Sequence, residues 1–241
     1  MRIKSRFTTA KYLIQTRYYM IQTFIKNMRT RESLRECNIC GWHGKNFYAF
    51  YNEMFKVKDE TLCPKCGSCI YQRALGKYLQ EECSRDYPYK VLEIAPHKSN
   101  PVGKYLTNID YISIDIVKHR AMIQMDLREL TYADNTFDII VCSAVLEHIK
   151  EDVLAMSEIY RVLKPKGVAL IEIPMGYHKA PLGTHTVEFN GQPFYEHYRS
   201  YGRDFGVKMT GLGFKYRTIN YNDFRFGLEN SSILGFYEGQ K

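Results

Sequence analysis

Three acidic residues stand at or just past the ends of short apolar runs: Glu93, Asp115 and Asp126. These runs are rich in β-branched residues and are bounded by turn residues or charges, which is typical of buried parallel strands. The carboxyl ends of such strands form the edge of an open sheet where ligands bind. Because a carboxylate accepts hydrogen bonds from both hydroxyls of a ribose, Asp115 predicts a nucleotide-type cofactor. Asp126, which Leu127 follows, is predicted to meet an adenine edge.

A second set of reactive side chains consists of two Cys-x-x-Cys pairs, each followed by glycine: Cys37, Cys40, Cys63 and Cys66. Two such turns supply four thiolates, a tetrahedral set that suits Zn²⁺. Four protein ligands leave no position for water, so the expected metal is structural. Cys69 is an alternative to Cys66, and His43 lies close enough to one pair to be another ligand. The rival interpretation is redox chemistry at the two pairs.

The elements that must position these residues follow from the apolar pattern, with runs at 91–95, 111–116, 137–142 and 168–173. A helical pattern from 153 to 163 lies between the last two runs and is closed by the predicted turn Lys164-Pro165-Lys166-Gly167. Alternating strands and helices predict an α/β, doubly wound, mostly parallel sheet. The segment 116–122 is too short for a crossover helix, which should be reduced to a turn. Two closing strands are expected at 214–222 and 231–237.

The stretch ADNTFDIIVCSAVLEHIKEDVLAMSEIYRVLKPKGVALIEIP resembles the class I S-adenosylmethionine (SAM) methyltransferases, specifically the methyltransferase type 11 group. The resemblance implies a seven-stranded Rossmann-like methyltransferase sheet with the last strand inserted antiparallel. It also implies cofactor contacts from the strand ends and following loops, by Glu93, Ala95, Pro96, Asp115, Ile116, Asp126, Leu127 and Ser143. The first loop departs from the glycine-rich pattern of the family, as a subgroup with a Leu-x-x-Ala-Pro loop and a preceding zinc ribbon also does.

His148 follows the run 137–142 at a position where members of that group place residues over the cofactor and acceptor. We therefore predict His148 and His197 as catalytic, with a base needed if the acceptor is a hydroxyl. The alternative for His148 is a structural hydrogen bond at the pocket wall. Glu147 is expected to orient His148 or to face solvent, and it is included in the predicted acceptor site.

The segment HYRSYGRDF resembles a block of the same subgroup and supplies the other predicted acceptor residues, Arg199, Tyr201 and Arg203. Two arginines four residues apart could clamp a carboxylate or a phosphate. Alternatively, Arg203 pairs with Asp204 at the start of a helix expected over 202–212.

The N-terminal segment carries most of the charge of the chain. Residues 1–36 hold nine Lys and Arg against two Glu, a net +7 of the +8 of the whole chain. Five apolar residues fall on one stripe of an amphipathic helix: Ile14, Tyr18, Ile21, Ile25 and Met28. We expect this stripe to pack on the body of the protein or on a second subunit of a homodimer. The alternative is peripheral contact of residues 1–30 with an anionic membrane surface.

Four segments are expected: a basic helix at 1–36, a zinc ribbon at 37–69, a connecting helix within 70–88 and the SAM methyltransferase domain at 89–241. Seven cysteines, two pairs of them in Cys-x-x-Cys spacing, favour a reducing compartment. No apolar run is long enough to span a bilayer and no secretory signal is expected. The predicted location is the cytoplasm, with contact at the inner face of the membrane as an addition.

The predicted function is methyl transfer from SAM to a small molecule or to a glycan or lipid-linked sugar. One alternative is an RNA methyltransferase in which the zinc ribbon binds the substrate. Outside residues 1–36 the net charge is only +1, which argues against a nucleic-acid partner. A second alternative is a SAM-binding module without catalysis, because the first loop lacks its glycines.

Overall fold

The computed structural model divides the chain into two compact units, residues 1–77 and residues 78–241. The structure describes residues 14, 17–18, 20–22, 24–25, 28, 35–52, 57–83, 87–97, 102–104, 108–173, 185–188, 197–219 and 236–241. Each unit is described by itself below.

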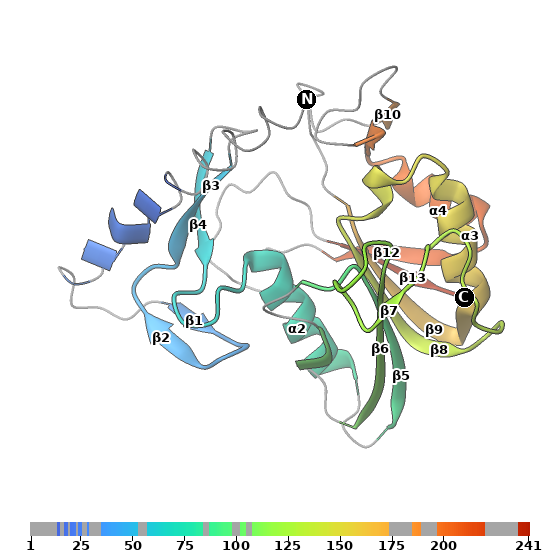
Figure 1. The fold of residues 1–241 in the computed structure, drawn as a ribbon, viewed down its shortest axis with the longest axis horizontal. Helices are drawn as coiled ribbons and strands as arrows, with labels where there is room; N and C mark the ends of the chain where they lie inside the picture. Colours follow the sequence, from blue (N-terminus) through green and yellow to red (C-terminus); the bar gives the residue numbers. More distant parts are fainter. Residues whose placement is uncertain are drawn as a thin grey trace. The chain divides into compact units, whose positions relative to one another are not determined.

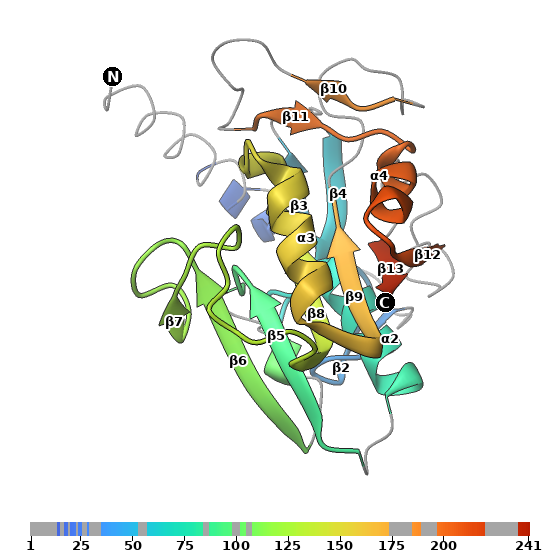
Figure 2. The same ribbon diagram turned by 90° about the vertical axis from the view of Figure 1, so that its right-hand side faces the viewer.

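The larger unit is built on a seven-stranded sheet with the order β12-β13-β9-β8-β5-β6-β7. Its strands are β5 (Tyr89–Ile94), β6 (Ile109–Asp115), β7 (Ile123–Gln124), β8 (Phe137–Ser143), β9 (Leu163–Glu172), β12 (Lys215–Ile219) and β13 (Phe236–Gln240). Five strands, β5 to β9, pair in parallel, whereas β13 runs antiparallel to both β9 and β12. The predicted seven-stranded, mostly parallel sheet and its antiparallel insertion are therefore confirmed (Figure 2).

The centre of the sheet is buried on both faces, which explains why the strands read as continuous apolar runs. Leu92 in β5 and Ile140 in β8 have no exposed surface. The helix α3 (Asp152–Val162) packs Met156 and Ile159 into the same core. It lies on the same face of the sheet as α4 (Phe205–Gly211) (Figure 1). These layers fix the carboxyl ends of β5, β6 and β8 as one edge.

Two connections were predicted as turns, residues 116–122 and residues 164–167, and the structure confirms only the first. Residues 116–122 form turns and bends without a helix, which confirms the predicted short crossover. The predicted turn 164–167 instead belongs to β9, where Phe137 pairs with Leu163 but Ile139 pairs with Val168. The additional residues bulge out of the ladder, and Lys166 adopts a φ of +66°. The turn residues Lys164-Pro165-Lys166-Gly167 therefore mark a bulge at the start of β9 and not a separate turn.

The helix α4 is shorter than its predicted range 202–212, because Tyr201 still forms a strand bridge and the helix begins only at Phe205. The strand predicted at 231–237 is described from Phe236 onward, as β13, and residues 231–235 lie outside the described part.

The smaller unit contains two antiparallel hairpins, which pair β1 (Arg35–Cys37) with β2 (Trp42–Gly44) and β3 (Tyr48–Asn52) with β4 (Val57–Leu62). The helix α2 (Ile70–Glu82) begins in it and lies within the range 70–88 predicted for the connecting helix. Phe47 is 1% exposed, and the buried Arg73 guanidinium lies 3.9 Å above its ring. Arg73 also donates a hydrogen bond to the carbonyl of Ser68 at 2.6 Å. A small aromatic core of this kind leaves much of the stability of the unit to other contacts.

The N-terminal stripe is exposed. Its five residues are helical: Ile14, Tyr18, Ile21, Ile25 and Met28. The exposed fractions of their side chains run from 39% at Ile25 to 69% at Ile14. Phe24 adds another exposed ring at 52%. Within the smaller unit these side chains are exposed, and packing on the rest of the protein, on a second subunit or on a membrane surface each stays a prediction. None of the helices in the described part has the length and apolar character that crossing a bilayer requires.

Candidate functional site

A cavity of about 310 Å³ opens at the carboxyl ends of β5 and β6. Ile94 and Ile114, the buried ends of these strands, form part of its wall, and Leu127, Val145 and Ile149 add further apolar surface. Its size and its apolar lining with a few polar groups are typical of a small-molecule pocket.

Asp115 ends β6 and lines the cavity with a side chain that is largely buried. Its Oδ1 accepts a hydrogen bond from the N–H of Val117 at 2.7 Å. Within the described residues, Oδ2 has no hydrogen-bond partner. This geometry fits a carboxylate that is held in place by one oxygen and can accept ligand hydroxyls with the other.

Asp126 also lines the cavity, but both of its oxygens accept hydrogen bonds from Arg128. These bonds hold the pKa of Asp126 below its usual range. Arg128 reaches on to Glu151 with a distance of 2.7 Å between Nη1 and Oε2. Asp126, Arg128 and Glu151 thus form an ion-paired group at the rim of the cavity. A ligand that contacts Asp126 would therefore also lie next to the Arg128 guanidinium.

Glu93 is the second-last residue of β5, yet it does not line the cavity. Its Oε2 accepts hydrogen bonds from the N–H of Val102 at 2.7 Å and from the hydroxyl of Tyr111 at 2.6 Å. Burial raises the pKa of Glu93 to about 7, although both hydrogen bonds act in the opposite direction. These hydrogen bonds join β5 to Val102 and to Tyr111 in β6, so the role of this carboxyl in the described residues is structural.

Ala95 stands where the family usually has the first glycine of the loop, and it lines the cavity. Its φ is +52°, in the left-handed region, and its N–H donates to the carbonyl of Ile114 at 2.8 Å. A non-glycine residue pays roughly 1–3 kcal/mol for such a conformation. The chain therefore keeps a glycine-like backbone shape at this point without the glycine.

Of the remaining predicted cofactor residues, Ile116 and Leu127 line the cavity, whereas Pro96 and Ser143 do not. The hydroxyl of Ser143 donates to the Oε2 of Glu172 at 2.8 Å. Loss of solvation at its position raises the pKa of the Glu172 carboxyl to about 7.

His148 and His197 come from distant segments and meet at the cavity wall. Their rings are 4.4 Å apart between centroids and nearly perpendicular, at 84°. His148 lines the cavity and its side chain is 42% exposed, whereas His197 is buried. Glu147, only 2% exposed, places Oε1 4.0 Å from the Nε2 of His148. Burial and the nearby Glu172 charge raise the pKa of Glu147 to about 8.

Of the predicted acceptor residues, Arg199 and Tyr201 are buried and Arg203 is exposed. Arg199 is buried, and its guanidinium donates to the carbonyls of Ile149 at 2.5 Å and Lys150 at 2.7 Å. The hydroxyl of Tyr201, also buried, donates to Asp152 at 2.7 Å. Neither residue lines the cavity, and the structure does not bring them together with the exposed Arg203 as a clamp.

Several cavity residues were not singled out in the sequence: Arg128, Lys150, Glu151 and Tyr198. Each lies within three positions of a residue that was selected, so proximity along the chain was the only available signal.

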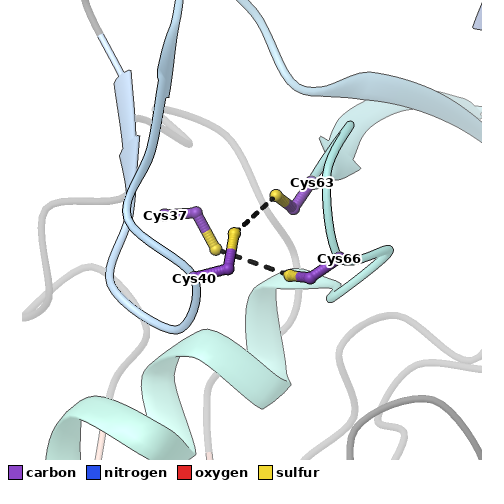
Figure 3. A group of neighbouring side chains, drawn as sticks. All are labelled: Cys37, Cys40, Cys63 and Cys66. Atoms are coloured by element: carbon purple, nitrogen blue, oxygen red, sulfur yellow. Dashed lines mark hydrogen bonds between the residues drawn. The ribbon is translucent and has the colours of Figure 1, made fainter.

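The cysteine pairs converge in the smaller unit (Figure 3). All four sulfur atoms lie within 4.8 Å of one another. Across the pairs, the Sγ atoms of Cys37 and Cys66 are 3.8 Å apart, and those of Cys40 and Cys63 are 3.6 Å apart. Metal–sulfur bonds of about 2.3 Å in a tetrahedron place sulfur atoms roughly 3.8 Å apart. The cluster therefore fits a tetrathiolate metal site. Cys69 instead donates to the side-chain oxygen of Gln72.

With this geometry established, comparison with known proteins gives a family match. Residues 62–171 match the methyltransferase domain family. The matched stretch contains β5 to β8, α3 and nearly all of β9, and hence the strand ends that form the cavity.

Two relatives share about half of the chain. Demethylmenaquinone methyltransferase of Staphylococcus carnosus (strain TM300) is 29% identical over 118 residues, which is 48% of this chain and 43% of that protein. The protein of the same description from Staphylococcus haemolyticus (strain JCSC1435) is 27% identical over 116 residues, 47% of this chain and 42% of the relative. The chain thus matches less than half the length of either. Among solved structures, the [4+2]-cyclase SpnF aligns with a TM-score of 0.49 at 16% identity, covering 69% of this chain and 79% of that one.

The position of Glu93 predicts a distinctive pH dependence of stability. Its pKa of about 7 in the folded state lies above its ordinary value of 4.5, so the folded state binds more protons between these values. The free energy of unfolding of the wild type should therefore fall as the pH rises through this window, by up to about 3 kcal/mol from this group. Glu93→Gln keeps an acceptor for Val102 and Tyr111 but does not titrate. Urea unfolding at about pH 5 and about pH 8 should show the variant gaining stability relative to the wild type at the higher pH.

Tyr111→Phe is the companion variant. The Tyr111 hydroxyl lowers the pKa of Glu93, so its removal should enlarge the pH dependence. A difference between Glu93→Gln and the wild type that stays constant with pH would show that Glu93 does not titrate in this way.

Proposed function

We propose that the chain is a SAM-dependent methyltransferase with a small-molecule acceptor. The observation that carries the proposal is the buried Asp115 carboxylate, with one oxygen held by the backbone and the other without a partner among the described residues, at the wall of the strand-end cavity. The match of residues 62–171 to a methyltransferase domain supports it.

The residues of the chain divide the work between binding and proton handling. Asp115 would hold the ribose hydroxyls, while Ile116 and Leu127 offer apolar surface to the adenine. SAM supplies a methyl group on a sulfonium, so the main task of the protein is to position an acceptor. His148, exposed at the cavity wall, would take a proton from an acceptor hydroxyl. This accessible histidine favours catalysis over a binding module.

The acceptor class is supported by two features. The relatives are named for demethylmenaquinone, a small molecule, and the chain outside residues 1–36 is nearly neutral. An RNA substrate would need a basic surface around the cavity. Within the small-molecule class, a glycan or lipid-linked sugar fits the exposed N-terminal stripe, because such an acceptor would be held at a membrane.

Removal of the Asp115 carboxylate tests the cofactor assignment. Asp115→Ala should weaken SAM binding by about 1.5–3 kcal/mol, roughly 10- to 150-fold, because buried hydroxyls lose their acceptor. Isothermal titration calorimetry measures this loss. Asp110→Ala, at a 65% exposed side chain in the same strand, should bind SAM as the wild type does. Absence of SAM binding by the wild type would reject the proposed function.

We further propose that the cysteine cluster holds one structural Zn²⁺. Four thiolates at tetrahedral spacing suit this ion and leave no open position for catalysis. The unit around it has a small core, so metal binding would supply folding free energy.

Metal analysis of the purified protein tests the zinc assignment. The wild type should contain one zinc per chain, whereas Cys63→Ser should lose it and unfold at lower urea concentration, since a ligand is removed. Cys83→Ser, which changes a cysteine outside the cluster, should retain the zinc. Stoichiometric iron, or full stability without metal, would contradict the assignment.

The N-terminal stripe supports contact with an anionic membrane surface. Its exposed side chains would enter the headgroup region while the surrounding net charge of +7 attracts acidic lipids. The location proposed for the protein is therefore the cytoplasm and the inner face of the membrane.

Vesicle sedimentation tests this contact. The wild type should bind vesicles with acidic lipids more strongly than neutral vesicles, and added salt should weaken the binding. Ile21→Glu should abolish it, because a charge enters the apolar stripe, while Val207→Glu, at a 71% exposed position elsewhere, should not. Loss of a salt-insensitive dimer in Ile21→Glu, with no vesicle binding by the wild type, would assign the stripe to a subunit interface.

A further inference from the structure

We propose that Glu147, His148 and His197 form a binding site for a divalent transition-metal cation at the wall of the cavity. This site is separate from the cysteine cluster and uses a different set of ligand atoms. The binding of a cation is inferred from side-chain geometry alone, whereas its use in methyl transfer rests on the proposed function.

The geometry of the three side chains suits a shared ion. Each offers one ligand atom, and the three atoms lie within 4.8 Å of one another. The two imidazole rings stand at 84°, so their nitrogen lone pairs can converge on one point, which stacked rings would prevent. Bonds of about 2.0–2.2 Å from a cation to nitrogen and oxygen place ligand atoms roughly 3–3.5 Å apart. Rotation of the half-exposed His148 would close the 4.0 Å separation from Glu147 to that range.

The buried carboxylate supplies an independent reason. Glu147 is 2% exposed, and its Oε2 has no hydrogen-bond partner in the described part of the chain. A buried polar atom without a partner destabilises the fold, and a buried charge does so more strongly. Glu172 adds a second carboxyl nearby, and no lysine or arginine contact to Glu147 is found among the described residues. A cation between Glu147 and the histidines would satisfy the carboxylate.

The surrounding contacts hold the ligands in place. The N–H of Tyr198 donates to the carbonyl of Glu147 at 2.7 Å, which joins the two ligand-bearing segments directly. The buried Arg199 guanidinium bonds the carbonyls of Leu146, Ile149 and Lys150, on either side of Glu147 and His148. Support of this kind around a ligand set fixes its spacing before the metal binds. It also gives Arg199 a role that its distance from the cavity would not suggest.

Three protein ligands leave further coordination positions open. Because His148 lines the cavity, these positions would face the space proposed for the acceptor. A cation there would lower the pKa of an acceptor hydroxyl, and with His148 as a ligand the released proton would pass to solvent instead of to this histidine. The mixed nitrogen and oxygen ligands suit Mn²⁺, Fe²⁺, Co²⁺ or Zn²⁺.

Manganese is the probe that distinguishes this site from the cysteine cluster, since Mn²⁺ prefers oxygen and nitrogen ligands to thiolates. The full chain with zinc in place is freed of loosely bound metal and titrated with Mn²⁺, and free Mn²⁺ is followed by electron paramagnetic resonance. The wild type should bind one Mn²⁺ per chain. Glu147→Gln and His148→Ala should each weaken binding by at least about tenfold. His119→Asn, at an exposed position outside the site, should bind as the wild type does.

If Glu147→Gln fails to fold, His148→Ala still tests the site. The His148 side chain is partly exposed, so its removal should leave the fold intact. Absence of Mn²⁺ binding by the wild type, or binding that neither variant changes, would overturn the metal site. Calorimetric titration of the same samples with SAM separates this outcome from failure of the proposed function. SAM binding without Mn²⁺ binding would reject the metal site alone, and Mn²⁺ binding without SAM binding would reject the methyltransferase assignment alone.

Discussion

The burial of parallel strands on both faces is the constraint on which the larger unit depends. Hydrogen bonding between β5, β6 and β8 aligns their ends, and apolar side chains cover most of both faces, so the polar groups of the site lie at the edge. Asp115 is held at that edge, and Glu147 and His148 follow the end of β8 closely. The chemistry of the site is thus concentrated where the apolar runs stop, because the interior of the sheet cannot accommodate it.

Much of this arrangement could be predicted from the sequence because it follows from strand periodicity. The strands, the short crossover at 116–122 and the placement of Asp115 at a strand end all depend on local patterns. The meeting of His148 and His197 depends on the path of the chain between them, which no local pattern contains. For Arg199, the spacing to Arg203 suggested a clamp, but the buried guanidinium contacts backbone carbonyls, Glu188 and Asp152, and no local pattern indicates these partners. The conformation of Ala95 was equally inaccessible, since alanine rarely adopts a positive φ.

Two buried acids illustrate how similar environments serve different purposes. Glu93 and Glu147 both have raised pKa values because of burial. Glu93 accepts two hydrogen bonds and braces the segment that begins at Val102, whereas Glu147, beside two histidines, keeps one oxygen that has no donor among the residues the structure describes. The first is an internal brace and the second is suited to bind a ligand. Hydrogen-bond satisfaction, more than the shift itself, separates structural from functional carboxyl groups here.

The antiparallel strand β13 has a consequence for synthesis in the cell. It lies between β9 and β12, although both precede it in the chain. Until residues 236–240 have left the ribosome, β12 lacks its sheet partner and β9 presents an open edge. Such unpaired edges invite association with other chains. The nascent larger unit therefore cannot complete its sheet during translation of the preceding residues, and protection of that edge by chaperones would matter most in this interval.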